Sequence, residues 1–150
     1  MRSNSNAYGE ASKNKVAPER SAQMALVRSK DTKPELVVRK IVSQLRFKYQ
    51  MNSKYFRGTP DLSFVRHKKA IFVHGCFWHQ HQSSTCWRSR IPKTRQEFWL
   101  PKLKANQIRD RKQIRELRKN DWQALVVWEC QTIKSKQPAL AKRIRHFLAN

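Results

Sequence analysis

Apolar and polar positions recur along the chain with helical and strand-like periods, which predict the order of its elements. A helical spacing follows Thr32, a residue type that caps helices, and Pro34 and Glu35 then fall in the first turn. The apolar side chains expected to point inward from this helix are Leu36, Val37, Ile41 and Leu45. A helix is therefore predicted to begin just after residue 31 or 32.

Two strands are predicted after the break at Gly58-Thr59-Pro60. Residues 61–65 alternate between polar and apolar, whereas residues 70–73 are almost wholly apolar and end at His74. Residues 66–69 have the composition of a turn. The two strands are therefore expected to form a hairpin.

Residues 94–120 have a helical and strongly basic pattern, within which Pro101 is expected to divide the helix or to mark the first turn of a second one. Asp110 shares a face with the apolar residues Leu103, Ile114 and Leu117. A carboxylate on such a face needs a partner that offsets its loss of water. Both a histidine and one of the neighbouring arginines could fill this role.

The remaining pattern completes a mixed α/β fold. Residues 122–128 predict a buried strand, and residues 138–148 predict a closing helix. Residues 1–19 have almost no apolar spacing and predict a flexible basic arm, and a short helix with Met24 is expected to start near residue 19 or 20. We predict one domain over residues 20–150, with a mixed central sheet flanked by helices.

Net charge restricts the class of partner. The 150 residues contain 33 Lys and Arg against 10 Asp and Glu, which leaves a formal charge of +23. Such a chain is expected to bind a polyanion, nucleic acid above all, with an affinity that falls steeply as salt rises. The sequence contains no long apolar run and no secretory signal, so neither membrane insertion nor secretion is expected. We expect a cytoplasmic location.

The segment from His74 to His81 concentrates imidazole, thiol and aromatic groups in eight positions. Cysteine and histidine bind transition metals, and the set Cys76, His81, Cys86 and Cys130 would make a closed tetrahedral zinc site of a structural kind. Buried free thiols are the alternative, and His67, His74 or His79 could compete as ligands. The paired motifs of zinc-dependent deaminases are absent from the sequence.

A second group of residues suits phosphodiester cleavage. Asp61 and a main-chain carbonyl could bind a hard cation, and His79 could accept a proton if Asp110 oriented its ring. Glu35, on the upstream helix, completes this group. Asp61 could equally be an ordinary turn carboxylate after proline.

These residues together resemble the very-short-patch repair (Vsr) DNA mismatch endonuclease family. The resemblance extends from about residue 20 to about residue 131 and rests on the following matches: Met24, Arg28-Ser29-Lys30-Asp31-Thr32, Glu35, Gly58-Thr59-Pro60-Asp61, Val73-His74-Gly75-Cys76-Phe77-Trp78-His79, Pro92-Lys93-Thr94, Glu97-Phe98-Trp99, Arg109-Asp110-Arg111 and Val127-Trp128-Glu129-Cys130. The Gly-Cys-Phe-Trp-His block is highly specific. The resemblance implies a fold related to type II restriction endonucleases. It also implies an enzyme that nicks one DNA strand 5′ of the thymine in a T·G mismatch, the product of 5-methylcytosine deamination, and so initiates very-short-patch repair.

The resemblance also implies roles for particular residues. Asp61 and the carbonyl of Val73 would bind magnesium, and His79 would be the general base, oriented by Asp110. His74 and Glu35 would complete the active site. The zinc ligands would be Cys76, His81, Cys86 and Cys130, and the residues inserted into DNA beside the mismatch would be Phe77, Trp78, Trp99 and Met24.

Two other function classes stay open on sequence alone. One is a zinc-stabilised DNA-binding module without catalysis, and the other is a small restriction endonuclease that cuts both strands of perfect duplex. Mismatch-repair proteins are further candidate partners. A monomer is expected, because a single nick needs one active site.

Overall fold

Four strands form one mixed sheet in the part of the chain that the computed structural model describes, namely residues 30–51, 53 and 59–150. In sheet order the strands are β1 (Gln50–Met51), β2 (Leu62–Phe64), β3 (Lys69–His74) and β4 (Gln123–Trp128). β1 and β2 pair antiparallel, as do β2 and β3, whereas β3 and β4 are parallel. The expected hairpin and the mixed central sheet are confirmed, and β1 is an additional strand that the pattern did not predict.

The register of the sheet places the candidate chemistry at one edge. Trp128 at the end of β4 pairs with His74 at the end of β3. β2 runs the opposite way, with Leu62 opposite Ile71, so its first residues lie beside the last residues of β3. Asp61, which precedes β2, therefore lies near the end of β3, at the edge where His74 and Trp128 also lie.

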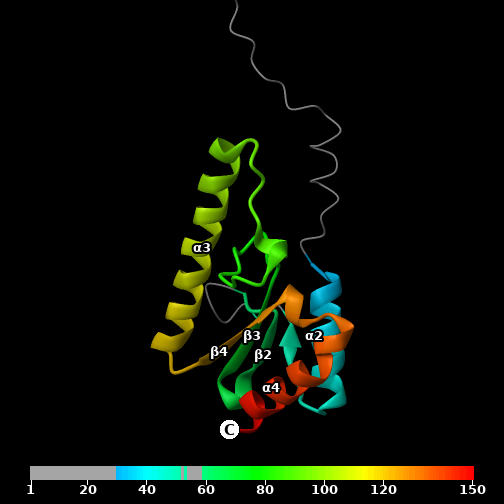
Figure 1. The fold of residues 1–150 in the computed structure, drawn as a ribbon. Coiled ribbons are helices and arrows are strands. Elements are labelled where there is room, and N and C mark those ends of the chain that lie inside the picture. Colours follow the sequence, from blue (N-terminus) through cyan, green and yellow to red (C-terminus); the bar gives the residue numbers. More distant parts are fainter. Residues whose placement is uncertain (1–29, 52, 54–58) are drawn as a thin grey trace, which may run out of the picture. The chain divides into compact units, whose positions relative to one another are not determined.

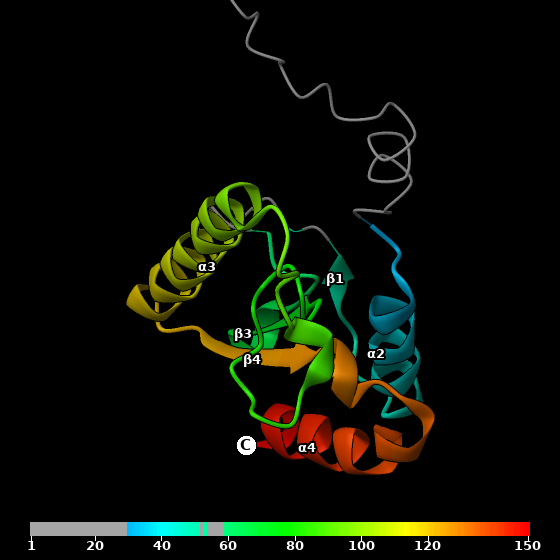
Figure 2. The ribbon, with the colours of Figure 1, turned by 45° about the horizontal axis from the view of Figure 1, so that its top comes forward.

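Helices cover both faces of this sheet (Figures 1 and 2). α2 (Lys33–Gln44) and α4 (Gln137–Ala149) pack on one face, and α3 (Gln96–Lys119) packs on the other. The first core contains Val38, Ile41, Val42, Leu62, Phe64, Ile71, Val73, Val127, Leu140, Ile144 and Leu148. A smaller core under α3 contains Ala70, Phe72, Leu117 and Trp122. The strands therefore alternate their side chains between two apolar layers, as a central sheet requires.

The inward face of α2 differs from the prediction at one residue. Leu36 is 50 % exposed, whereas Val38 and Val42 are fully buried. Val38, Ile41 and Val42 follow the three- and four-residue spacing of one helix face. Leu36 comes two residues before Val38 and therefore points to the opposite side of the helix. The expectation that Leu36 points inward was wrong, while Val37 and Leu45 pack against the core as expected.

α3 is one continuous helix of 24 residues with Pro101 inside it, so the predicted division at Pro101 was wrong. The proline lies within the first two turns, where it removes one intrahelical hydrogen bond, and its ring is exposed. The long remainder of the helix keeps it regular, because its apolar face packs on the sheet. Leu103, Asp110 and Leu117 are all buried along that face, as the spacing predicted.

Several expectations fall on residues outside the described ranges. These are the basic arm over residues 1–19, the short helix with Met24 and the position of Gly58. Residues 31–150 form one compact unit, which carries every feature described below. Within the described part of the chain, no helix combines the length and the apolar character that crossing a membrane demands.

Candidate active site and metal cluster

Asp61 is a half-buried carboxylate at the start of β2, bonded to the neighbouring strand. Its Oδ2 accepts a hydrogen bond of 2.7 Å from the main-chain N–H of Val73. Burial raises the pKa of Asp61 to about 6, the Val73 bond opposes that rise, and the nearby Glu35 carboxylate adds to it. The carboxyl groups of Asp61 and Glu35 are thus close enough to interact, and Asp61 is shielded from water. A hard cation bound there would stabilise the charged form of both groups.

Glu35 is held in one orientation by the start of α2. Thr32 caps the helix, and its Oγ1 donates a hydrogen bond of 3.0 Å to Glu35 Oε1. The main-chain N–H of Asp31 donates to Oε2 at 2.9 Å, and Arg39 Nη2 lies 3.3 Å from the same oxygen. The capping residues seen in the sequence therefore fix the carboxylate whose charge acts on Asp61. Arg39 was not singled out, although its spacing of four residues from Glu35 is a recognisable signal.

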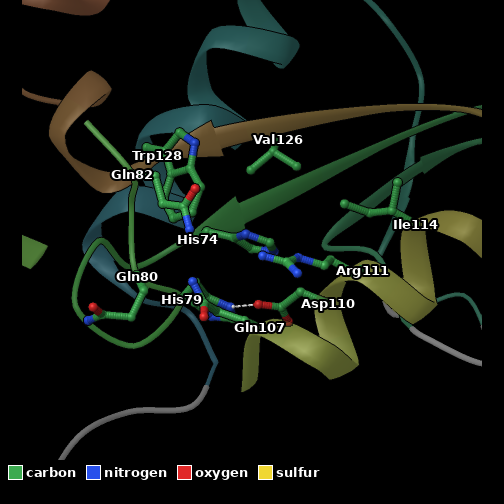
Figure 3. A pocket seen from close by; sticks show the side chains of 10 residues that line it. All are labelled: His74, His79, Gln80, Gln82, Gln107, Asp110, Arg111, Ile114, Val126 and Trp128. Atoms are coloured by element: carbon green, nitrogen blue, oxygen red, sulfur yellow. Dashed lines mark hydrogen bonds and ion pairs between the residues drawn. The ribbon is translucent and has the colours of Figure 1, made fainter. Parts of the chain in front are cut away.

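His79 and Asp110 form a direct pair between the loop after β3 and helix α3 (Figure 3). The distance from His79 Nδ1 to Asp110 Oδ2 is 2.6 Å, and Asp110 is buried. The sequence left a histidine or an arginine as the partner of Asp110, and in the structure the partner is a histidine, His79. With Nδ1 donating to the carboxylate, Nε2 of His79 keeps a lone pair that can accept a proton.

His74 lies flat against His79. The two rings are 4.0 Å apart between centroids with an angle of 7° between their planes. Burial lowers the pKa of His74 to about 4, and the charge of His79 adds to that effect. His74 is therefore a neutral ring at physiological pH, and it limits the positions open to the His79 ring.

The donor atoms of His74, His79 and Asp110 lie within 4.8 Å of one another, which is close enough for a shared metal ion. A metal binds imidazole in the plane of the ring, and two parallel stacked rings do not direct their lone pairs at a common point. This geometry favours proton transfer by His79 over metal binding by the pair. The group opens into a cavity of about 240 Å³, which is lined by His74, His79, Gln80, Gln82, Gln107, Asp110, Arg111, Ile114, Val126 and Trp128 (Figure 3).

The four predicted zinc ligands converge at the same edge of the sheet. Donor atoms of Cys76, His81, Cys86 and Cys130 lie within 4.8 Å of one another. The Nδ1 atom of His81 is 3.8 Å from the sulfur of Cys76 and 3.4 Å from the sulfur of Cys130. All three cysteines are free thiols, and Cys76 and Cys86 are buried. Three sulfurs and one imidazole nitrogen so arranged fit a closed tetrahedral zinc site.

Backbone contacts bring these ligands together from distant parts of the chain. The N–H of His81 donates to the carbonyl of Cys76 at 2.9 Å, which closes the loop after β3. The N–H of Cys130, just after β4, donates to the sulfur of Cys76 at 3.4 Å. Burial raises the pKa of the Cys76 thiol to about 12, so a bound cation would have to supply the charge that makes it a thiolate.

The other histidine considered as a ligand is elsewhere. His67 belongs to a short turn at the opposite end of the hairpin, and its ring contacts Phe47 with centroids 6.1 Å apart.

Four aromatic rings gather between the loop after β3 and the start of α3. Phe77 contacts Trp78 and Trp99 with centroid distances of 5.1 and 5.2 Å, and Phe98 contacts Trp99 at 5.1 Å. Lys102 Nζ lies 5.4 Å from the Trp78 ring. Phe77, Trp78 and Trp99 are all partly exposed, so aromatic surface lies open to solvent beside positive charge, a combination suited to contacts with bases. Met24 lies outside the described residues.

Glu129 and Trp128 belong to a matched block of the sequence but were assigned no role from it, and both make contacts at this edge. Glu129 Oε2 accepts a hydrogen bond of 3.2 Å from the N–H of Cys76, and Trp128 contacts both His74 and His81 through its ring. The signal for Glu129 was its place beside Cys130. The position of Trp128 depends on strand register, which the spacing did not determine.

Comparisons with known proteins agree on one family. The family model described as DNA mismatch endonuclease Vsr matches residues 14–85. The type II nicking enzyme V.XorIIP of Xanthomonas oryzae pv. oryzae is 38 % identical over 135 residues, covering 89 % of this chain and 96 % of that protein. The DNA mismatch endonuclease Vsr of Escherichia coli is 33 % identical over 132 residues, covering 86 % and 83 %.

A solved structure supports the fold. The catalytic domain of the homing endonuclease I-Bth0305I superposes with a TM-score of 0.54 at 17 % identity, covering 77 % of this chain and 93 % of that one. At this identity the match concerns the fold alone, and it agrees with the expectation of an endonuclease-like α/β fold.

Proposed function

This chain belongs to the Vsr family of DNA mismatch endonucleases, and on that premise we propose that it nicks one strand of duplex DNA on the 5′ side of the thymine in a T·G mismatch. The observation that carries the proposal is the pair formed by His79 and Asp110, 2.6 Å apart at a cavity wall beside the partly buried Asp61. Such a set suits hydrolysis of a phosphodiester.

His79 is the proposed general base. Its Nδ1 hydrogen donates to Asp110, so Nε2 can take a proton from the attacking water. Asp110 keeps the ring in this tautomer and stabilises the imidazolium formed when the proton arrives. His74, neutral and stacked on His79, restricts the ring to an orientation compatible with both contacts.

Magnesium is the proposed cofactor, held by Asp61 and the main-chain carbonyl of Val73 with Glu35 nearby. The residues fit such an ion, because Asp61 is desolvated and faces a second carboxylate. Bound there, the cation would neutralise charge on the phosphate and lower the pKa of water. Arg39 limits the repulsion between the two carboxylates, since it pairs with Glu35 and its charge lowers the pKa of Asp61.

Zinc is the proposed occupant of the Cys76, His81, Cys86 and Cys130 cluster, and its role is structural. A closed set of four protein ligands leaves no coordination position for water. A zinc ion there would join the loop after β3 to the residues that follow β4. Cys76 and Cys130, one from each segment, are 54 positions apart in the sequence.

Recognition of the mismatch is assigned to the aromatic group of Phe77, Trp78 and Trp99, with Met24 as a fourth inserted residue. A T·G wobble pair stacks poorly, so parting it from its neighbour costs less than at a Watson–Crick step. These rings, packed edge to face beside Lys102, can fill the gap that opens. The large excess of basic residues supplies affinity without sequence preference.

We further infer that the protein acts as a monomer in the cytoplasm, associated with DNA. Mismatch-repair proteins are candidate partners in that compartment. We do not propose a membrane as a partner. The proposed domain boundary separates residues 1–19, a flexible basic arm, from a single domain over residues 20–150.

The test uses magnesium and end-labelled duplexes that differ only in one pair, T·G or T·A, with each strand followed separately. A nick confined to the thymine strand of the mismatched duplex is expected. Binding without cleavage would instead indicate a DNA-binding module, and equal cutting of both strands in both duplexes would indicate a restriction endonuclease.

A further inference from the structure

Trp128 lies between the Cys/His cluster and the paired histidines. Its ring stacks on His81 with centroids 4.3 Å apart and an interplanar angle of 13°. The same ring meets His74 edge to face, with centroids 5.3 Å apart and an angle of 75°. One side chain thus contacts a ligand-type residue of the cluster and the ring on which His79 stacks.

The contacts form an unbroken series of side chains. It runs from His81 through Trp128 to His74, then to His79 and finally to Asp110 on α3. Each ring in the series therefore limits the orientation of the next. Packed aromatic pairs have preferred geometries, so displacement of one member changes the position that suits its neighbour.

The backbone fixes Trp128 independently of its ring. Its residue pairs with His74 in the parallel register of β3 and β4, and its N–H donates to Gln131 Oε1 at 3.0 Å. The Cβ position of Trp128 is thus set by the sheet. The indole itself is half-buried, with His81 against its face and its edge directed at His74.

We propose that Trp128 is a positioning residue that couples the Cys/His cluster to the histidine pair. Ordering of His81 by the cluster orients the indole, the indole fixes His74, and His74 fixes the ring of His79. The cluster then affects the chemical step as well as stability. This inference rests on the proposed function, because it assigns His79 to proton transfer.

Histidine-ring NMR tests the coupling without reference to nicking. The variants are Trp128→Leu and, as a milder change that keeps a ring, Trp128→Phe. Trp122→Leu is the matched control, because Trp122 is a buried tryptophan just before the start of β4, packed with Phe72 and Leu117. Ring signals of His79, assigned by a His79→Gln variant, are expected to shift strongly in Trp128→Leu, weakly in Trp128→Phe and least in the control.

The kinetic test compares turnover with binding on the mismatched duplex. A small misplacement of a catalytic group costs about 10²-fold in rate. We expect Trp128→Leu to lower kcat by about 10- to 100-fold with KM within about twofold, and Trp128→Phe to recover most of the loss. Zinc content is measured in each variant, and the loss in kcat is expected even where zinc is retained.

Two results would overturn the proposal. One is His79 signals in both Trp128 variants that match those of the wild type. The other is a fall in kcat no larger than that of Trp122→Leu. If Trp128→Leu does not fold, the His79 ring signals of Trp128→Phe decide, because they are expected to shift weakly but more than those of Trp122→Leu. If the wild type does not nick T·G duplex, the proposed function fails, and the NMR comparison still decides whether Trp128 positions His79.

Discussion

The Cys/His cluster and the histidine–carboxylate site lie at the same edge of the sheet but are built on different principles. In the cluster, four donor atoms face one another from separate parts of the chain, within 4.8 Å. In the candidate active site, individual side chains have protein partners, as Asp61 has the N–H of Val73 and His79 has Asp110. Four donor atoms that face one another suit a closed metal site. A side chain that is hydrogen-bonded through one atom keeps its other polar atom free for substrate. Neighbouring residues of one short segment therefore belong to two sites with different arrangements of donor atoms.

The sharpest way to separate the two groups is to remove the imidazole of His79. General bases contribute about 10²–10⁴-fold to rate, so His79→Ala is expected to lower single-turnover nicking by that factor. Thermal stability should fall as well, because the buried Asp110 carboxylate loses its partner. His67→Ala is the control, because His67 is exposed on a turn at the far end of the hairpin. Nicking by His79→Ala at the rate of the control would remove His79 from the mechanism.

The converse change targets the cluster. Cys130→Ser is expected to abolish zinc binding and to lower the free energy of unfolding by about 3 kcal/mol, since metal affinity is part of folding energy in such sites. Zinc release to a colorimetric chelator and urea unfolding measure the two effects. Wild-type protein stripped of metal should be as unstable as the variant, and a wild type that contains no zinc when freshly purified contradicts the assignment.

Truncation of the aromatic group is expected to act on mismatch recognition alone. Stacking of a base on an aromatic ring contributes about 1–3 kcal/mol, so Trp99→Leu should weaken binding to T·G duplex by roughly 30-fold. Affinity for the T·A duplex should change little, because phosphate contacts dominate there. Parallel titrations at one salt concentration compare the duplexes, and an equal loss on both would assign Trp99 to general affinity.

The smallest effect concerns the stability cost of the Asp61 charge. Its folded pKa is raised from 3.8 to about 6, so ionisation above pH 6 opposes folding, and the cost vanishes below about pH 4, where the group is protonated in both states. Asp61→Asn keeps an acceptor for Val73 without the charge. In magnesium-free buffer it is expected to stabilise the protein by about 1–2 kcal/mol at pH 8 and by nothing at pH 4.

Urea unfolding across this pH range measures that gain. Added magnesium should stabilise the wild type at pH 8 and leave Asp61→Asn unchanged. A gain that grows as the pH falls would contradict the assignment.

Much of the site could be predicted because the residue types constrain one another. Asp110 lies on an apolar helix face, so it needed a buried partner, and His79 occupies that position. The capping signal at Thr32 located α2 and with it Glu35. The four cluster residues carried a chemistry of their own, which made their convergence expected.

Other features depend on information that local pattern does not contain. β1 has only two residues, too few to show a period. The direction of Leu36 was decided by the packing of the opposite face of α2 on α4 and the sheet. The continuity of α3 through Pro101 was decided by the packing of the residues after the proline, where Leu103, Asp110 and Leu117 are buried. The contacts of Trp128 follow from the register that sets it opposite His74, which is a property of the folded sheet.

The most direct test of the central claim, that Asp61 and His79 form a magnesium-dependent nicking site, is a magnesium titration of T·G duplex cleavage by wild-type protein and Asp61→Ala. The thymine strand should be nicked by the wild type in proportion to magnesium occupancy, and Asp61→Ala should bind the duplex equally well but nick it at least about 10³-fold more slowly. Cleavage by Asp61→Ala at the wild-type rate and with the same magnesium dependence would contradict that claim.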